Sequence, residues 1–165
     1  MISRLLTKAP DSMGDPKECP YYLISRVSLA ITSALKVGFS EAGVERVRPG
    51  YMGVLLVLWR EDNLKVNELG RQAGLEPSTM TGLIDRMERD GFVKRVPDPA
   101  DRRVLRIQLT EDGRGVKGAA LRVVDRTLAD ALGGVSGKEI ATLKEILRRV
   151  LTNLNEEESD GSAAR

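Results

Sequence analysis

The sequence predicts a mainly α-helical (α+β) fold that contains one small β-hairpin. Apolar residues recur at three- and four-residue steps over most of the chain, and they change to alternate positions only near residues 92–109. Of the 165 residues, 41% are hydrophobic but only 4% are aromatic, which suits a core of aliphatic side chains. This length is enough for one ordinary domain or two small intertwined ones.

The N-terminal part predicts an arm followed by two helices. Residues 1–18 combine prolines, a glycine and scattered charges, which favour a flexible arm, and they lack the apolar core of a signal peptide. A first helix is expected over Tyr21–Glu41, with Gly43 just past its end. Pro49 opens a second helix, whose residues Tyr51–Trp59 are apolar nearly all round, as in a helix buried on most sides.

A helix-turn-helix is predicted in the middle of the chain. A short helix over Asn67–Ala73 is closed by Gly74, and a second helix over Pro77–Asp90 follows after a short connection. One face of the second helix is apolar and consists of Met80, Leu83, Ile84 and Met87. The opposite face and its flanks carry Ser78, Thr79, Thr81, Gly82, Asp85, Arg86 and Arg89.

Small hydroxyl side chains at the start of that second helix favour DNA binding. They let a helix approach a duplex closely, and hydroxyls and helix-terminal N–H groups bind phosphate while neighbouring side chains reach base edges. Gly82 costs about 1 kcal/mol relative to Ala in a helix interior, and close passage of DNA or tight packing would explain it. Similar patterns also occur in proteins that do not bind DNA.

A hairpin follows, and it concentrates positive charge. Strands are expected over Phe92–Val96 and Leu105–Leu109, joined by a loop over Pro97–Arg103 that is too long for a tight turn. From Arg86 to Arg106 there are seven basic and four acidic residues, a local excess of three in a chain whose net charge is +2. An arginine-tipped loop suits the minor groove, whose negative potential attracts arginine.

Helical spacing resumes after the hairpin. One helix is expected over Val116–Ala131, and Gly133-Gly134 separates it from a last helix whose apolar residues recur every three or four positions from Ile140 to Leu154. Two heptads do not distinguish a core stripe from a seam that faces a partner. Long terminal helices would leave apolar surface for a second copy to cover, with a monomer as the alternative. Residues 156–165 predict an acidic, disordered tail.

Several classes of function are disfavoured. The chain has no histidine and one cysteine, Cys19, which excludes an intramolecular disulfide, a Cys/His zinc site and a histidine general base. Residues 113–118 match G-x-G-x-x-G, but only helical spacing follows, without the second parallel strand of a dinucleotide site. We therefore expect no enzyme, metal or cofactor. No apolar run approaches the length of a membrane span, so a cytoplasmic protein is expected.

Two segments resemble the MarR family of bacterial transcription regulators. Asp101–Arg114 is similar to the family's wing signature, which is D-x-R, an apolar strand, then L-T and an acidic pair before G-R. Leu83–Arg95 resembles the recognition helix running into the first wing strand. The resemblance implies a winged helix-turn-helix over residues 49–110. It also implies an intertwined homodimer held by a helical dimerisation region, residues 19–48 and 111–155.

The resemblance also assigns roles to single residues. It places Ser78, Thr79, Thr81, Gly82 and Arg86 in the major groove, with Arg89 on the same face, and Arg103 in the minor groove. Asp101 would brace Arg103, and Arg102 would support the loop or contact phosphate. Gly82 departs from the larger polar residue often found there. The implied function is repression at a pseudo-palindromic operator with half-sites about one turn apart, and the alternative is a winged helix that binds protein.

The resemblance further implies an input signal. Many members release DNA when a small aromatic or amphipathic molecule binds, and Tyr22, Arg26, Tyr51 and Trp59 are candidates for such a pocket, although aromatic residues at these positions also suit a core. Some relatives sense peroxides through a cysteine near the first helix. Cys19 has no second cysteine to resolve a sulfenic acid, so it is either a redox sensor or an incidental thiol. The absence of histidine excludes a His-ligated metal sensor.

Overall fold

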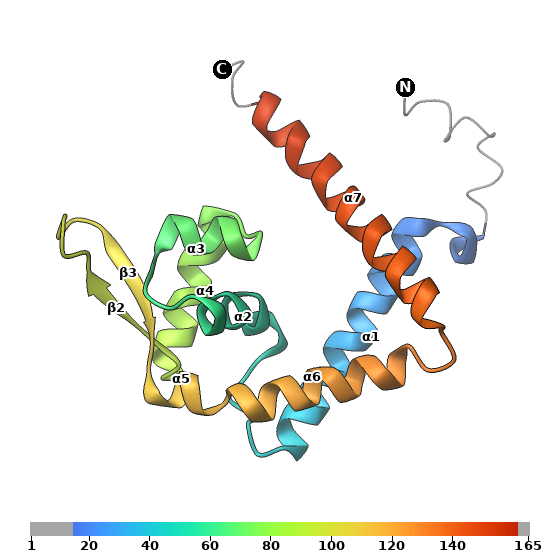
Figure 1. The fold of residues 1–165 in the computed structure, drawn as a ribbon, viewed down its shortest axis with the longest axis horizontal. Helices are drawn as coiled ribbons and strands as arrows, with labels where there is room; N and C mark the ends of the chain where they lie inside the picture. The colour runs from blue at the N-terminus through green and yellow to red at the C-terminus, as the bar shows by residue number, and fades with distance from the viewer. Residues whose placement is uncertain (1–14, 162–165) are drawn as a thin grey trace. The chain divides into compact units, whose positions relative to one another are not determined.

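The computed structural model describes residues 15–161, and residues 1–14 and 162–165 lie outside the described part (Figure 1). It confirms a helix-rich winged-helix fold with a small antiparallel sheet. The elements are η3 (Pro16–Glu18), α1 (Pro20–Glu41), η4 (Pro49–Tyr51), α2 (Met52–Arg60), β1 (Leu64–Lys65), α3 (Val66–Ala73), α4 (Pro77–Arg89), β2 (Val93–Pro97), β3 (Leu105–Leu109), α5 (Glu111–Gly115), α6 (Lys117–Ala131) and α7 (Gly137–Gly161).

The chain divides into two compact units, residues 1–127 and residues 128–165, which are described separately. Most of the predicted arm lies outside the described residues, and its described end forms the single turn η3. Among the described helices of the first unit, α1 alone is long and apolar enough to pass for a membrane span. Core helices of soluble proteins and signal sequences meet the same criterion of length and composition.

The turn of the helix-turn-helix is built on Gly74, which ends α3. Its φ of +65° lies in the left-handed region that favours glycine. In this conformation the Gly74 amide donates to the Arg71 carbonyl and the Leu75 amide to the Gly70 carbonyl, which closes the helix end. Pro77 then starts α4, because its fixed φ and missing N–H suit a first helical turn.

Three strands form the sheet, in the order β1-β3-β2, with both pairs antiparallel. β2 and β3 form the predicted hairpin, and Val93 lies opposite Leu109. The sequence pattern did not predict β1, which has only two residues and pairs Leu64 with Ile107. This short strand joins the wing to the start of α3, because Lys65 is the residue immediately before that helix.

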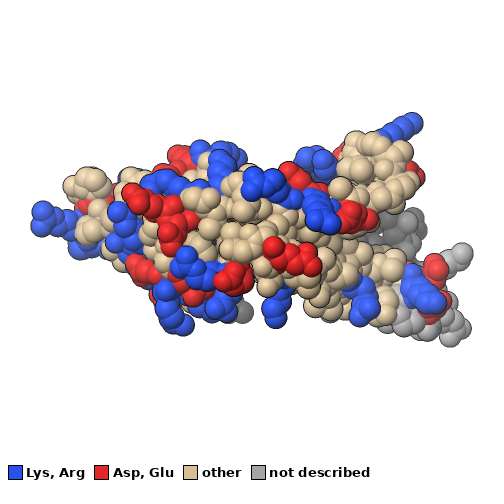
Figure 2. Space-filling model, turned by 90° about the horizontal axis from the view of Figure 1, so that it is seen from below, with Lys and Arg blue, Asp and Glu red and all other residues tan. Residues whose placement is uncertain are grey.

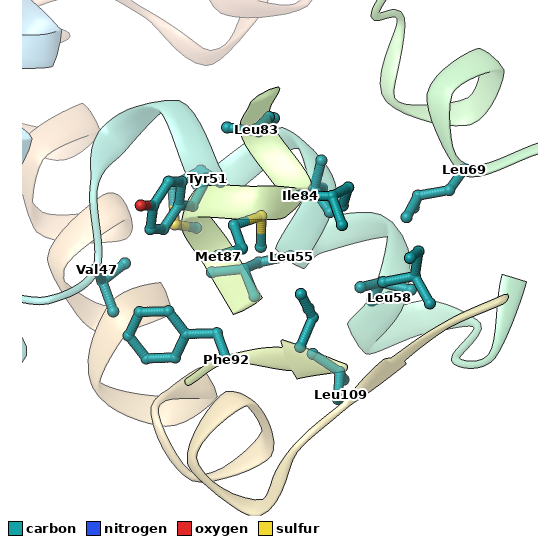
Figure 3. Close-up of a cluster of buried hydrophobic side chains, with 14 of the residues drawn as sticks. Val47, Tyr51, Leu55, Leu58, Leu69, Leu83, Ile84, Met87, Phe92 and Leu109 are labelled. Atoms are coloured by element: carbon teal, nitrogen blue, oxygen red, sulfur yellow. The ribbon is translucent and has the colours of Figure 1, made fainter. Parts of the chain in front are cut away.

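The core lies between the helix-turn-helix and the sheet (Figure 3). Side chains from α2, α4 and the hairpin point toward one another there, and Leu55, Ile84, Met87 and Phe92 are fully buried. The apolar face predicted for α4 is therefore the face that packs inward. Burial of each such side chain contributes about 1.5–3 kcal/mol, so the core fixes which face of α4 remains exposed.

Residues 111–131 form two helices where the sequence predicts one from Val116 onward. Thr110 caps the extra helix α5, since its Oγ1 accepts a hydrogen bond of 3.0 Å from the Gly113 amide and donates one of 2.5 Å to the Gly91 carbonyl. The sequence pattern did not predict α5 because residues 111–115 contain no apolar side chain. Helix α5 thereby attaches the end of β3 to the turn that follows α4.

The second unit contains α7, which starts with a capping box. The Glu139 carboxylate accepts from the Ser136 amide at 2.8 Å and from the Ser136 hydroxyl at 2.6 Å. The helix runs to Gly161, past the predicted boundary at residue 155, because the intervening residues include glutamates, which are good helix formers. The predicted tail is thus helical as far as Gly161. Several large apolar side chains of α7 are exposed, including Ile146, Leu151 and Leu154.

Candidate nucleic-acid interface

The outward face of α4 carries the polar residues expected for DNA contact. Ser78, Thr79, Thr81, Arg86 and Arg89 are all exposed, and Gly82 is half-buried among them. The Thr81 hydroxyl donates to the Pro77 carbonyl at 3.2 Å, and its oxygen can still accept a hydrogen bond. A Cβ built on Gly82 would meet only the Arg86 guanidinium, at 3.5 Å, which is an ordinary contact. Internal packing therefore does not require a glycine at this position.

The wing loop holds one arginine in a defined orientation. The Asp101 carboxylate accepts hydrogen bonds from Arg103 Nε at 3.0 Å and from Nη2 at 2.9 Å, and the Arg103 amide donates to the same carboxylate at 3.1 Å. The Arg103 side chain is nevertheless 90% exposed. The predicted pairing of Asp101 with Arg103 is therefore present, and it presents a pre-oriented guanidinium to solvent. Arg102 is exposed beside it.

The same pairing perturbs the acidity of Asp101. Hydrogen bonds from the Arg103 side chain and then from its amide lower the pKa of the Asp101 carboxyl. Because the pKa of this carboxyl is lower in the folded protein than in the unfolded chain, the ion pair stabilises the fold fully at pH values above the unfolded-state pKa of about 3.9. This stabilisation is lost as the pH falls through the pKa of the folded state. The wing should therefore keep this pair from neutral pH to below the ordinary carboxyl pKa of about 3.9.

We predict that Arg103→Ala raises the pKa of Asp101 toward the ordinary value. The measurement is a carboxyl-carbon NMR titration of the wild type and the variant, with Asp98 as an internal control because Arg103 does not contact it. An Asp101 carboxyl that titrates identically in both proteins would show that the pair does not form in solution.

Asp98 is a structural residue of the wing that the sequence analysis missed. Its side chain is 2% exposed, and its carboxylate accepts from the Ala100 amide at 2.8 Å and from Arg106 Nε at 2.6 Å. The amide bond from Ala100 is the main cause that lowers the pKa of Asp98, followed by the bond from Arg106. Lys65 Nζ lies 3.8 Å from the same carboxylate. A buried carboxylate thus anchors the wing loop, although an aspartate between two prolines reads as a surface residue.

The basic residues of this region form two groups: those that bind acidic residues or carbonyls within the fold, and those that are exposed to solvent. Arg95 on β2 binds Glu88 and also Asp85, the latter at 2.5 Å, so it joins the sheet to α4 and neutralises the acidic residues of that helix. Arg106 is committed to Asp98 and to the Asn63 carbonyl, at 2.8 Å from the latter. The remaining cations, Arg86, Arg89, Lys94, Arg102 and Arg103, are exposed. Basic side chains project accordingly from the wing end of the molecule, at the left of Figure 2.

The four candidate effector residues lie in different environments. Tyr51 is a core residue: it is 1% exposed, its hydroxyl donates to Asp90 Oδ2 at 2.6 Å, and burial raises its pKa to about 12. Trp59 Nε1 donates to the Gly113 carbonyl at 2.8 Å. Tyr22 and Arg26 are exposed on α1. Tyr51 and Trp59 therefore have structural partners of their own. Cys19 is half-buried at the N-cap of α1.

Sequence comparison relates the chain to transcriptional regulators. The MarR family profile matches residues 52–105. The chain is 38% identical over 103 residues to the HTH-type transcriptional regulator TtmR of Methylorubrum extorquens, covering 62% of this chain but only 50% of that one. It is 34% identical to the organic hydroperoxide resistance transcriptional regulator of Bacillus subtilis, covering 66% and 71%. It is 30% identical to the transcriptional activatory protein BadR of Rhodopseudomonas palustris, covering 94% and 91%.

Structure comparison agrees with these relatives. The PcaV transcriptional regulator of Streptomyces coelicolor, solved in complex with its natural ligand, is 26% identical with a TM-score of 0.72, over 82% of this chain and 94% of that one. Reduced AbfR bound to DNA is also 26% identical, with a TM-score of 0.66 over 81% and 90%. The relatives, the solved structures and the wing geometry agree, and the chain belongs to the MarR family of winged helix-turn-helix transcriptional regulators.

Proposed function

We propose that this regulator binds double-stranded DNA sequence-specifically, with α4 in the major groove and the wing in the adjacent minor groove. The observation that carries the proposal is Arg103, whose guanidinium is 90% exposed at the wing loop and yet held by Asp101. An ordered, exposed arginine suits a narrow minor groove, because little side-chain entropy is lost on binding. The exposed hydroxyls and arginines of α4 supply contacts to phosphate and base edges.

The DNA-binding form is a homodimer in this proposal. Helix α1 exposes Ile24, Val27 and Leu29, and α7 exposes Leu147 and Leu151. Soluble monomers rarely expose so many large apolar side chains on their helices. A second copy would cover these residues. Two recognition helices related by a two-fold axis then match a pseudo-palindromic operator whose half-sites lie about one turn apart.

We infer repression that is relieved by a small aromatic or amphipathic molecule, in a protein that works in the cytoplasm where its DNA is. The solved structure of PcaV contains a natural ligand, and that of CouR from Rhodococcus jostii contains p-coumaroyl-CoA, which supports a ligand-responsive regulator. BadR is named as an activatory protein, so the direction of control is tested by transcription from the target promoter with and without the protein.

The wild-type protein should bind a duplex from upstream of its own gene more tightly than a scrambled duplex of equal length. Affinity for both should fall steeply with salt, because bound cations release counterions from the DNA. Fluorescence anisotropy over a salt series measures this, and light scattering should give about twice 18.1 kDa. A protein-binding winged helix would show weak, salt-insensitive association with either duplex, and a mass of one chain would contradict the dimer.

A further inference from the structure

We propose that a hollow between the wing and α3 holds the sugar-phosphate backbone of the DNA, with Lys65 and Arg71 as its phosphate contacts. The hollow has a volume of about 680 Å³. One wall is β1 and α3 with Lys65 and Arg71, and the other is the end of the wing loop with Arg103 and the beginning of β3. Neither Lys65 nor Arg71 belongs to the set that sequence patterns assign to DNA. The proposal rests on the DNA binding proposed above and names a further part of that interface.

The two walls are held at a fixed spacing. Strand β1 ends at Lys65, which lies opposite Arg106 in the ladder with β3, and α3 starts at the next residue. Arg106 in turn binds the buried Asp98 at the base of the wing loop. Strand pairing and a buried ion pair therefore fix the spacing of the backbone segments that form the two walls. A preformed site of this kind binds with less conformational cost.

The lining matches the chemistry of a nucleic-acid strand. Three cations, Lys65, Arg71 and Arg103, line the hollow against one carboxylate, Glu68. Arg71 takes part in no ion pair within the described residues. Lys65 Nζ lies 3.8 Å from the buried Asp98 carboxylate, and the Lys65 side chain is 49% exposed. Apolar side chains of Val66, Val104 and Leu105 lie between these charges, and Leu105 is 40% exposed. Alternating anionic phosphates and apolar deoxyribose faces fit such a mixed wall.

The position of the hollow also favours duplex DNA over a free anion. A recognition helix in the major groove and a wing in the adjacent minor groove straddle the one backbone that separates the two grooves. That backbone must pass between the wing and the helix-turn-helix, and this is where the hollow lies. The first helix of a helix-turn-helix is also the one that crosses the backbone. The volume is much larger than one phosphate group needs.

The test uses a random-sequence duplex, because phosphate contacts carry no sequence information. The double variant Lys65→Gln/Arg71→Gln should make the slope of log affinity against log salt shallower by about 0.9 for each lost contact, or about 1.8 per bound chain. The matched control Lys36→Gln/Arg126→Gln removes the same charge from exposed positions outside the winged helix. Light scattering first confirms that it keeps the wild-type oligomeric state, and its slope should then equal that of the wild type. Asp98 keeps its bonds from Arg106 and Ala100 in the double variant, so the fold is expected to survive.

Three outcomes separate the alternatives. A double variant with the wild-type slope would overturn the hollow as a phosphate site, although DNA binding by the wild type would still stand. A wild type that binds no duplex at any salt would instead remove the proposed function itself. Thermal unfolding is also measured in sodium phosphate and in sodium chloride at equal ionic strength. If phosphate raises the melting temperature of the wild type but not of the double variant, while the two proteins show the same DNA slope, the hollow binds a free anion. That result would overturn the proposal.

Discussion

Gly113→Ala should destabilise the winged helix by about 3 kcal/mol. A Cβ at this position would lie 2.1 Å from the Phe92 carbonyl oxygen and 3.1 Å from the Leu109 side chain. The carbonyl oxygen cannot rotate away, because it also accepts the Thr110 amide at 3.0 Å and belongs to the buried start of the hairpin. Relief therefore requires α5 to move away from the sheet. Urea denaturation followed by circular dichroism measures the change.

Gly115→Ala is the matched control for this prediction. Gly115 ends the same short helix, and a Cβ added there meets nothing within 4 Å. Since alanine is favoured over glycine in helices by up to about 1 kcal/mol, this variant should be neutral or slightly stabilised. Equal denaturation midpoints for the two variants would show that the close approach of α5 to Phe92 is absent in solution.

Arg103→Ala should weaken binding to the operator by about 1–3 kcal/mol per bound chain, which is roughly 5- to 150-fold. The guanidinium is the exposed, oriented cation of the wing, and within the described residues its side chain is bonded only to Asp101. An exposed ion pair contributes at most about 1 kcal/mol to stability, so the fold and the oligomeric state should be unchanged. Anisotropy titration with operator and scrambled duplexes measures the effect.

Arg102→Ala serves as the neighbouring control. Arg102 is exposed in the same loop, and as a phosphate contact it should lower affinity for the operator and the scrambled duplex alike. Arg103→Ala should instead reduce the preference for the operator. If Arg103→Ala binds the operator as tightly as the wild type, the wing does not enter a groove and its assignment fails.

Periodicity predicted the elements that present the interface, because each has one buried face. The apolar positions of α4 and the alternation in β3 follow directly from the core that they build, so the exposed Ser78, Thr79 and Arg86 followed as well. Strand β1 was missed because two residues are too few to show an alternation. Helix α5 was missed because its five residues, Glu111–Gly115, include no apolar side chain and so show no periodicity.

Interactions between distant parts of the chain could not be predicted. Asp98 reads as a solvated loop residue, and only the fold brings Arg106 and Lys65 to its carboxylate. Tyr51 was a candidate for an effector pocket, yet Asp90, 39 positions later, occupies its hydroxyl. The hollow between the wing and α3 depends on the pairing of residue 65 with residue 106, which no local pattern contains.

The hydrogen bond between Trp59 and Gly113 makes the intrinsic tryptophan fluorescence of the protein a probe of the contact between α2 and α5. Trp59 is the single tryptophan of the chain, and it is half-buried. Its indole N–H donates a hydrogen bond to the carbonyl of Gly113 in α5. Indole emission responds to the polarity and hydrogen bonding of its surroundings. A shift in emission wavelength when a small molecule is added would therefore report a change in the surroundings of the contact between α2 and α5, without any label attached to the wing or to the DNA.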